Sequence, residues 1–293
     1  MIVVPAEPKM IPSTDGVDVA VHDFGGDGPP LLVCHATGFH AWCYEPMLRH
    51  LTDRHRCVGV DLRGHGDSRG PDALSYGWQG MADDLLAVIE ALGLTDLCAV
   101  GHSMGGAAIV LAEERRPGTF RAAWMFEPIL FPHDYQFHEP ERRNRMADSA
   151  RRRRDSFPSR DDAYDNYASK PPLDQLDPEA LRAYVDHGFA DTADGQVTLK
   201  CRPDTEAAVF ESSDSGAFEL LDQVEMPVVV AVGRDTNGPA EFGESIVGQL
   251  RRGALEPHPE LSHFGPMERP AELAARVAAA CADALAGPPP TSG

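Results

Sequence analysis

Apolar and polar residues follow one another along this chain in the pattern of buried strands and amphipathic helices. Residues 31–34, 57–60 and 228–232 are almost continuously apolar, as expected of strands that are buried on both faces. Residues 78–92 instead carry apolar side chains at helical spacing, and Gly93, a common helix stop, follows them. Strands that alternate with helices predict an α/β fold with a mostly parallel central sheet and helices on both faces.

The same criteria predict the remaining elements of this architecture. A turn at Asp15-Gly16 between two strand-like runs predicts a β-hairpin near the start of the chain, and the proline-rich residues 287–293 predict a disordered tail. Further strands are expected at residues 9–12, 17–24, 97–100, 120–126 and 254–256, and further helices at residues 42–51, 241–250 and 270–286.

The alternation stops in residues 131–222, which are charged, punctuated by proline and mostly helical in pattern. We interpret this segment as a helical cap insertion over the active site of a core formed by residues 1–130 and 223–286. The segment is rich in arginine, including the run at residues 151–154. These arginines form either a solvated helix face that pairs with the chain's own carboxylates, or a docking patch for an acidic substrate or carrier protein.

Ser103 stands at the apex of a predicted strand–turn–helix, in the pattern G-x-S-x-G. The glycines at −2 and +2, Gly101 and Gly105, are needed because side chains there would collide across a tight turn. A helix N-terminus directly after the serine favours a developing negative charge. This context predicts that Ser103 is a nucleophile.

Composition narrows the classes of partner. With 293 residues, 42% of them hydrophobic, the chain can form one large globular domain with an insertion. A net charge of −20 argues against nucleic acid and anionic membrane as partners, and no run approaches the roughly 18 apolar residues of a membrane span. The first residues lack the pattern of a signal peptide, so a cytoplasmic location is expected. The sequence leaves open whether the chain forms a homodimer.

The cysteines and histidines show no metal-binding pattern. The six cysteines form no C-x-x-C pair, and the twelve histidines form no H-E-x-x-H or H-x-H cluster. We therefore expect buried thiols without disulfides, no metal and no cofactor.

Three motifs in this order resemble the α/β-hydrolase superfamily, particularly bacterial serine hydrolases with a helical cap. They are the G-x-S-x-G elbow at 101–105, the loop D-x-R-G-x-G-x-S at 61–68, and the segment 261–270 around His263. The resemblance covers nearly the whole chain and implies the α/β-hydrolase fold. It further implies that Ser103 is the nucleophile and His263 the catalytic base. Superfamily dehalogenases and epoxide hydrolases use aspartate as nucleophile, so these activities are disfavoured.

Two positions depart from the family pattern. The first is Ala36, where the family has glycine after the histidine, here His35. An alanine fits only if its φ is not positive. The family's oxyanion hole would here be formed by the backbone N–H groups of Thr37 and Met104. The Thr37 hydroxyl either donates a further hydrogen bond there or satisfies a loop amide.

The second departure concerns the acid that would serve the histidine. Asp235 comes one residue earlier than in the usual G-x-x-D, whereas Glu127 directly follows the strand predicted at 120–126, as in some superfamily members. Both preserve the order nucleophile, acid, histidine. We favour Glu127, because it should emerge at the carboxyl edge of the sheet and because Pro128 favours an extended backbone before it. Asp235 stays open.

The predicted function is a serine hydrolase that cleaves a small-molecule ester or a related acyl bond. Alternatives are a cofactor-free C–C bond hydrolase, a haloperoxidase-like member and, in another class, a non-catalytic ligand-binding protein on this fold. Candidate substrate-pocket residues, which would otherwise pack in the core or support loops, are Phe39, Trp42, Phe131, Phe264, His35 and His102.

Overall fold

The computed structural model of the chain describes residues 7–71, 74–132, 140–213, 216–235 and 238–286. A main sheet of eight strands forms its centre. The strands are β1 (Lys9–Pro12), β2 (Asp18–Gly25), β3 (Pro30–Cys34), β4 (Arg56–Asp61), β5 (Leu97–His102), β6 (Phe120–Phe126), β10 (Val228–Val232) and β11 (Gly253–Pro257). Their order is β1-β2-β4-β3-β5-β6-β10-β11. β2 pairs antiparallel with β1 and β4, and the other neighbouring strands pair parallel.

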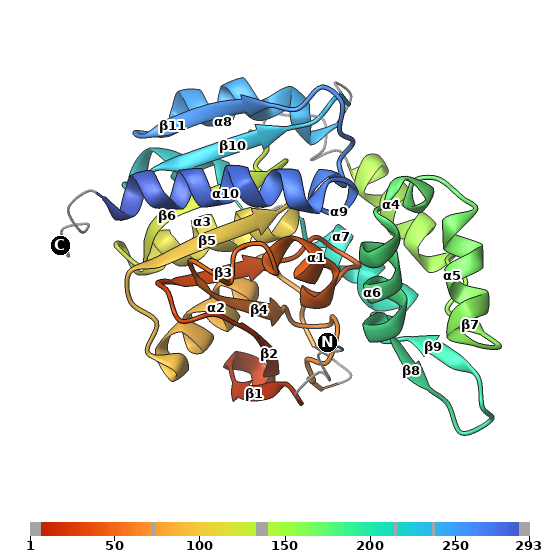
Figure 1. Cartoon of the computed structure of the whole chain (residues 1–293). Helices are drawn as coiled ribbons and strands as arrows, with labels where there is room; N and C mark the ends of the chain where they lie inside the picture. Colours follow the sequence, from red (N-terminus) through yellow and green to blue (C-terminus); the bar gives the residue numbers. More distant parts are fainter. Residues whose placement is uncertain (1–6, 72–73, 133–139, 214–215, 236–237, 287–293) are drawn as a thin grey trace.

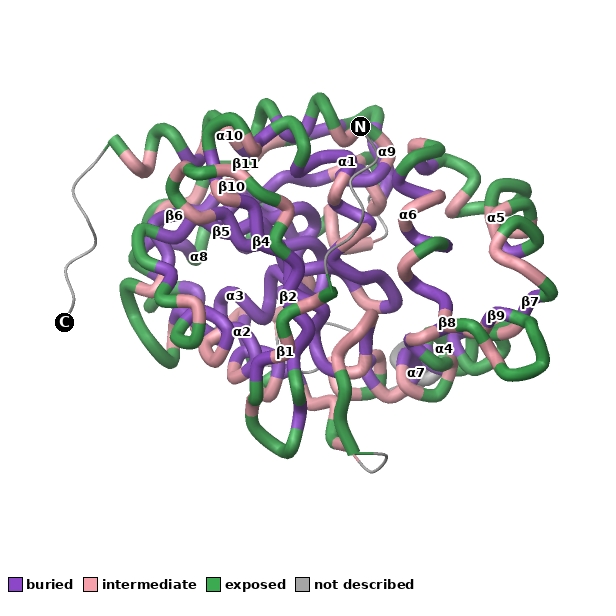
Figure 2. The backbone as a smooth tube through the Cα atoms, turned by 60° about the horizontal axis from the view of Figure 1, so that its bottom comes forward, coloured by how far each residue is buried: buried purple, intermediate pink, exposed green. Residues whose placement is uncertain are grey.

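Successive side chains of a strand point to opposite faces of the main sheet. Apolar side chains therefore lie on both faces, and helices cover both. Leu32 packs in the core beneath α2 and α3, while Leu31 packs in the core beneath α1 and α10. Figure 2 shows the central strands buried between these layers. The helices around the sheet are η1 (Thr14–Gly16), η2 (Ala41–Tyr44), α1 (Glu45–Leu48), α2 (Trp78–Leu92), α3 (Met104–Arg115), η5 (Phe218–Gln223), η6 (Pro239–Phe242), α8 (Gly243–Gln249), α9 (Gly265–Glu268) and α10 (Pro270–Leu285).

A region of helices and short strands is inserted between β6 and β10. Its helices are α4 (Pro140–Arg151), α5 (Arg160–Ala168), η4 (Leu173–Gln175), α6 (Pro178–Gly188) and α7 (Pro203–Glu211). Its strands β7 (Ser156–Phe157), β8 (Phe189–Asp191) and β9 (Val197–Leu199) form a small antiparallel sheet in the order β7-β9-β8. Figure 1 shows this inserted region, in green to teal, at the end of the main sheet toward which β5 and β10 point.

The α/β-hydrolase fold class is confirmed, and most predicted elements are found where the apolar pattern places them. The predicted helix at residues 42–51 is a 3₁₀ turn, η2, followed by the single turn α1. The inserted region is mostly helical, as predicted. Its three short strands were not predicted, because strands of two or three residues are too short to show an alternating pattern. The predicted tail at 287–293 lies outside the described residues.

Two observations bear on the compositional expectations. All six cysteines are buried and unpaired, as expected. Among the residues that the structure describes, none of the helices combines the length and the apolar character that crossing a membrane requires.

Candidate active site

Ser103 occupies a strained turn between β5 and α3. Its backbone has φ 54° and ψ −118°, a conformation that a non-glycine residue keeps only when its surroundings hold it. Its N–H donates to the Phe126 carbonyl at 3.0 Å, and its carbonyl accepts from the Ile129 N–H at 3.1 Å. A Cβ on Gly105 would lie 2.1 Å from the Cys34 carbonyl oxygen, so this position admits only glycine.

Glu127 is the carboxylate that the fold places against His263. Nδ1 of His263 lies 2.6 Å from Oε2 of Glu127, and the Gly233 N–H donates to Oε1 at 2.8 Å. The Glu127 side chain is fully buried, and that of His263 is 25% exposed. These two contacts fix both the carboxylate and the ring orientation of the histidine.

The backbone of Glu127 differs from the prediction. Pro128 favours an extended conformation before it, yet Glu127 has φ 41°, in the left-handed region. The Glu127 N–H donates to the Ala231 carbonyl of β10 at 2.8 Å. Neighbouring strands therefore impose this conformation, and local preference does not decide it.

Asp235, the other candidate acid, lies on the exposed loop after β10. The neighbouring Arg234 donates from its backbone N–H to the Leu261 carbonyl at 2.8 Å, and from its guanidinium to the Glu260 carbonyl and to Oε1 of Gln175, both at 2.6 Å. The Gly238 N–H donates to the Asp235 carbonyl at 3.3 Å. In the part of the chain that the structure describes, His263 is joined to Glu127 and not to Asp235.

A buried hydrogen-bond chain through His102 links the loop after β3 to the His263 loop. Nε2 of His102 donates to the His263 carbonyl at 2.7 Å, since a carbonyl can only accept. Nδ1 of His102 then accepts from the Tyr44 hydroxyl at 2.7 Å, and the Tyr44 oxygen accepts from the Ala36 N–H at 3.1 Å. Burial holds the pKa of His102 well below its usual value, with the nearby His263 acting in the same direction, so the ring is neutral.

The loop after β3 carries the predicted oxyanion groups. Among the described residues, those other than glycine with positive φ are Asp15, Asp96, Ser103 and Glu127, so Ala36 meets the condition set for an alanine at its position. The Thr37 hydroxyl donates to the Met104 sulfur at 3.3 Å, which neither of the two expectations for this hydroxyl included. Met104 begins α3, and N–H groups of a first helical turn have no partner within the helix.

A cavity of about 510 Å³ lies between the main sheet and the inserted region. Ser103 and His263 both line it, together with Thr37. Its wall is largely apolar, with a few polar and charged side chains. The further lining residues are Ala36, Phe39, Trp78, Ile129, Phe131, Met146, Ser149, Arg153, Asn166, Tyr167, Lys170, Pro171, Pro172, Leu173, Tyr184, Glu206, Phe210, Ser213, Pro239 and Phe264.

Of the six candidate pocket residues, Phe39, Phe131 and Phe264 line this cavity. Trp42 lies elsewhere: its ring stacks on His187 with centroids 4.0 Å apart, and its indole N–H donates to His22 at 3.0 Å. Trp42 therefore joins α6 to the core instead of contacting the cavity.

His35 and His102 also lie outside the described lining of the cavity. Both form hydrogen bonds to backbone groups of neighbouring loops. His35 donates from Nδ1 to the Ala36 carbonyl at 2.8 Å and accepts at Nε2 from the Leu62 N–H at 2.9 Å. Burial, assisted by the nearby His65, lowers the pKa of His35 to about 3. No property of the sequence distinguishes these two buried histidines from ones that contact substrate.

The loop D-x-R-G-x-G-x-S contains two buried charged residues, Asp61 and Arg63. Asp61 accepts hydrogen bonds from His22 and from the Ala41 and Asp67 N–H groups, at 2.8–2.9 Å. The side chains of His22, Asp61 and Asp67 lie close enough together to hold a metal ion. These residues are too far apart in the sequence to form a recognisable metal-binding motif. Their ligand atoms already have partners, since His22 also bonds Trp42 and Asp67 pairs with Lys200 at 2.6 Å.

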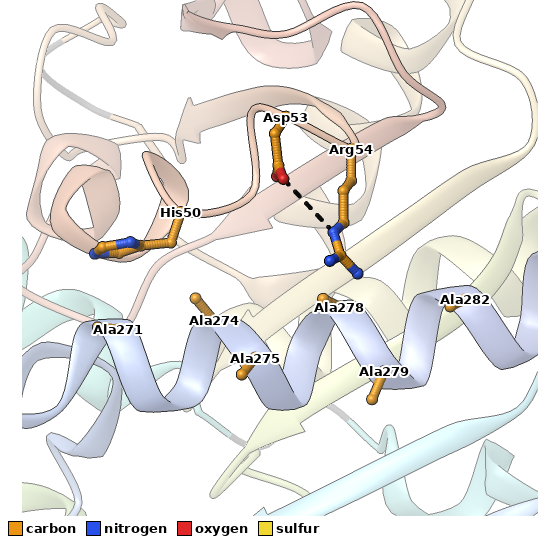
Figure 3. Close-up of a pocket in the computed structure, with 9 residues that line it drawn as sticks. All are labelled: His50, Asp53, Arg54, Ala271, Ala274, Ala275, Ala278, Ala279 and Ala282. Atoms are coloured by element: carbon orange, nitrogen blue, oxygen red, sulfur yellow. Dashed lines mark ion pairs between the residues drawn. The ribbon is translucent and has the colours of Figure 1, made fainter.

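A second hollow, of about 310 Å³, is lined by α10 and by the segment that follows α1 (Figure 3). Its lining consists of alanines of α10 together with the exposed His50, Asp53 and Arg54, and the last two form an ion pair at 3.7 Å. Neither Ser103 nor His263 lines it, so the candidate chemistry belongs to the cavity beneath the inserted region.

Comparison with known proteins places this chain in a family. The model described as "Alpha/beta hydrolase family" matches residues 31–276. The chain therefore belongs to the alpha/beta hydrolase family.

Solved structures show the same fold over most of the chain. An E-2-(acetamidomethylene)succinate hydrolase superposes with a TM-score of 0.77 and 20% identity, covering 90% of this chain and 95% of that chain. A thermophilic esterase from Thermogutta terrifontis superposes with a TM-score of 0.73 and 22% identity, covering 95% of this chain and 99% of that chain. The esterase EaEST from Exiguobacterium antarcticum superposes with a TM-score of 0.71 and 20% identity, covering 94% of this chain and 99% of that chain. At these identities the likeness concerns the fold alone.

Relatives in sequence match a shorter part. The magnesium-chelatase 30 kDa subunit of Rhodobacter capsulatus is 38% identical over 92 residues, which are 31% of this chain and 32% of that protein. The 2-(acetamidomethylene)succinate hydrolase of Mesorhizobium japonicum is 34% identical over 97 residues, 33% and 34% of the two chains. The chain thus spans about a third of the length of these curated relatives.

Proposed function

We propose that this protein is a serine hydrolase that cleaves a carboxylic ester or a related acyl bond. Ser103 would be the nucleophile, His263 the general base and Glu127 the acid of the triad. The observation that carries the proposal is the 2.6 Å contact between Glu127 and His263 beside a cavity that Ser103 also lines.

The proposed mechanism follows from these groups. A serine hydroxyl is a weak nucleophile at neutral pH and needs a base to take its proton. With Nδ1 of His263 bound to Glu127, Nε2 is the nitrogen left to accept the proton of Ser103 and return it to the leaving group. The buried carboxylate would stabilise the imidazolium that forms.

The negative charge of the tetrahedral intermediate would be held by backbone N–H groups of Thr37 and Met104. Each such donor contributes about 3–4 kcal/mol where it has been measured in a serine hydrolase. Collapse of the intermediate would leave an acyl group on Ser103, which water then removes by the same base. A cap role for the inserted region is supported by the cavity wall, because more than half of the residues that line the cavity come from this region.

The test combines a covalent probe with a substrate panel. A fluorophosphonate should add once to the native protein, as measured by intact mass, and should not add to Ser103→Ala. p-Nitrophenyl esters of graded chain length should be hydrolysed by the native protein and not by that variant. Labelling that survives Ser103→Ala would refute the nucleophile, and absence of labelling would favour a non-catalytic binding protein. Turnover of a β-diketone without ester turnover would favour the C–C hydrolase.

A further inference from the structure

One arginine of the inserted region is turned into the cavity. Arg153 donates from Nη1 to Oε2 of Glu206 at 2.5 Å and from Nη2 to the Tyr184 hydroxyl. The Arg153 and Glu206 side chains are 24% and 9% exposed, and both line the cavity. The other described arginines of the run lie outside that lining, and Arg151 pairs with Glu211 at 2.7 Å.

The Arg153–Glu206 pair lies against the loop that carries Thr37. A Cβ on Gly38, whose φ is +79°, would lie 2.5 Å from Oε1 of Glu206 and 3.3 Å from Nη1 of Arg153. The pair is therefore next to the residue that follows Thr37. Replacing such a mostly buried ion pair with apolar residues is often neutral or stabilising, so fold stability alone does not account for a charged wall here.

Positive charge exceeds negative charge among the described residues that line the cavity. Arg153 and Lys170 are cations, and Glu206 is the carboxylate among the lining residues. Lys170 donates to Oδ1 of Asn166 at 2.6 Å, a neutral partner that leaves its charge in place. The chain as a whole has a net charge of −20, so this local excess of positive charge runs against the overall balance.

We propose that the cavity selects acyl substrates that carry a carboxylate away from the scissile bond, and that Arg153 and Lys170 bind this carboxylate. The inference rests on the proposed function. Glu206 and Tyr184 occupy two of the five N–H groups of the guanidinium, whose planar fork suits a carboxylate. Arg153 offsets the charge of Glu206, and Lys170 supplies the excess that attracts an anion.

The test compares two substrates that differ in one charge. One is the mono-p-nitrophenyl ester of adipic acid, and the other is the same compound with its free carboxyl methylated. The readout is the ratio of their kcat/KM values in the native protein, Lys170→Met and the double variant Arg153→Gln/Glu206→Gln, which keeps polar side chains and removes both charges of the pair. Arg152→Met is the matched control for Lys170→Met, because each substitution removes one positive charge. Arg152 is exposed and lies outside the described lining of the cavity.

The native protein should prefer the carboxylate substrate by about tenfold, the value of one charge-assisted contact. Lys170→Met should bring this ratio toward one, mainly through KM, because it removes the excess positive charge. The double variant should lower the ratio several-fold through loss of the Arg153 contact, while Arg152→Met leaves it unchanged. If the double variant does not fold, the ratio measured for Lys170→Met tests the inference by itself, because Lys170 is exposed. Where turnover is slow, the ratio is read from how strongly each compound slows fluorophosphonate labelling of Ser103.

Three results would overturn the inference. They are a native ratio at or below one, a ratio unchanged by Lys170→Met, and an equal loss in Arg152→Met, which would assign the effect to overall charge. In each case hydrolysis of the methylated ester would leave the proposed function standing. Failure of both turnover and Ser103 labelling would instead remove the proposed function, and the inference with it.

Discussion

Nδ1 of His263 lies 2.6 Å from Oε2 of Glu127, across 136 residues of chain. The carboxylate comes from the end of β6, whereas the resemblance places the usual acid after β10. The end of β10 nevertheless contributes, because the Gly233 N–H donates to the other oxygen of the same carboxylate. Two adjacent strands thus hold one acid in place.

Glu127→Gln should lower kcat by about 10⁴-fold, the loss seen when the acid of a serine-protease triad becomes an amide. An amide in this place loses the negative charge that stabilises the imidazolium and can favour the wrong histidine tautomer. Asp235→Asn, on the exposed loop, should stay within a few-fold of the native value. Ester turnover by both variants, with circular dichroism as a check of folding, measures this. A large loss in Asp235→Asn beside a near-native Glu127→Gln would assign the acid to Asp235.

Tyr44→Phe should lower kcat by about tenfold or more and leave KM little changed. The substitution leaves the buried Ala36 N–H and Nδ1 of His102 without their shared partner, which costs about 1–3 kcal/mol for each unsatisfied group. Because His102 holds the His263 carbonyl, the effect should reach the base. Tyr164→Phe, in α5, is the control. Loss of stability in urea with an unchanged kcat would make Tyr44 purely structural.

Met146→Trp should shorten the range of acyl chains that the cavity accepts. Met146 lines the cavity but is 40% exposed, so a larger side chain can be accommodated without disrupting the core. The kcat/KM for long p-nitrophenyl esters should fall relative to the acetate, while fluorophosphonate labelling of Ser103 continues. The neighbouring exposed Arg145→Trp should not change the preference. An unaltered chain-length profile in Met146→Trp would argue against a cap role for α4.

Stability should fall between pH 7.5 and pH 5.5 because of buried neutral histidines. Burial lowers the pKa of His35 to about 3 and of His40 to about 4, and holds that of His102 well below its usual value. Below the unfolded-state pKa of about 6.5 the unfolded chain binds protons that the folded chain excludes. The free energy of unfolding should therefore drop by about 1.4 kcal/mol per pH unit for each of these histidines.

Urea unfolding at the two pH values measures this loss. The interval stays above the range in which most carboxylates titrate, so it isolates the histidines. His50→Gln, at an exposed histidine, should leave the pH dependence unchanged. Equal stability at pH 7.5 and 5.5 would contradict the neutral, buried assignment.

Prolonged EDTA treatment should leave ester turnover unchanged. His22, Asp61 and Asp67 lie within reach of one ion, but hydrogen bonds and an ion pair already engage them. A loss of turnover that zinc or manganese restores would show that this group or another binds a metal needed for activity.

Much of the fold could be predicted because its signals are local. The apolar run of β10, the period of α2 with Gly93 in the left-handed region at its end, and the G-x-S-x-G turn each depend on a few neighbouring residues. Side-chain sterics and burial act at that range, so the printed sequence already indicates these elements. The short strands of the inserted region lack such a signal, since two or three residues show no period.

What the sequence by itself determined was therefore the architecture, Ser103 as the candidate nucleophile and His263 as the candidate base. Tertiary structure alone decided which carboxylate lies against His263, because the left-handed backbone of Glu127 is imposed by β10 across the sheet and opposes the preference that Pro128 sets. It likewise turned Trp42 onto His187 and Arg153 into the cavity. These choices depend on contacts between residues far apart in the chain, which no local spacing encodes.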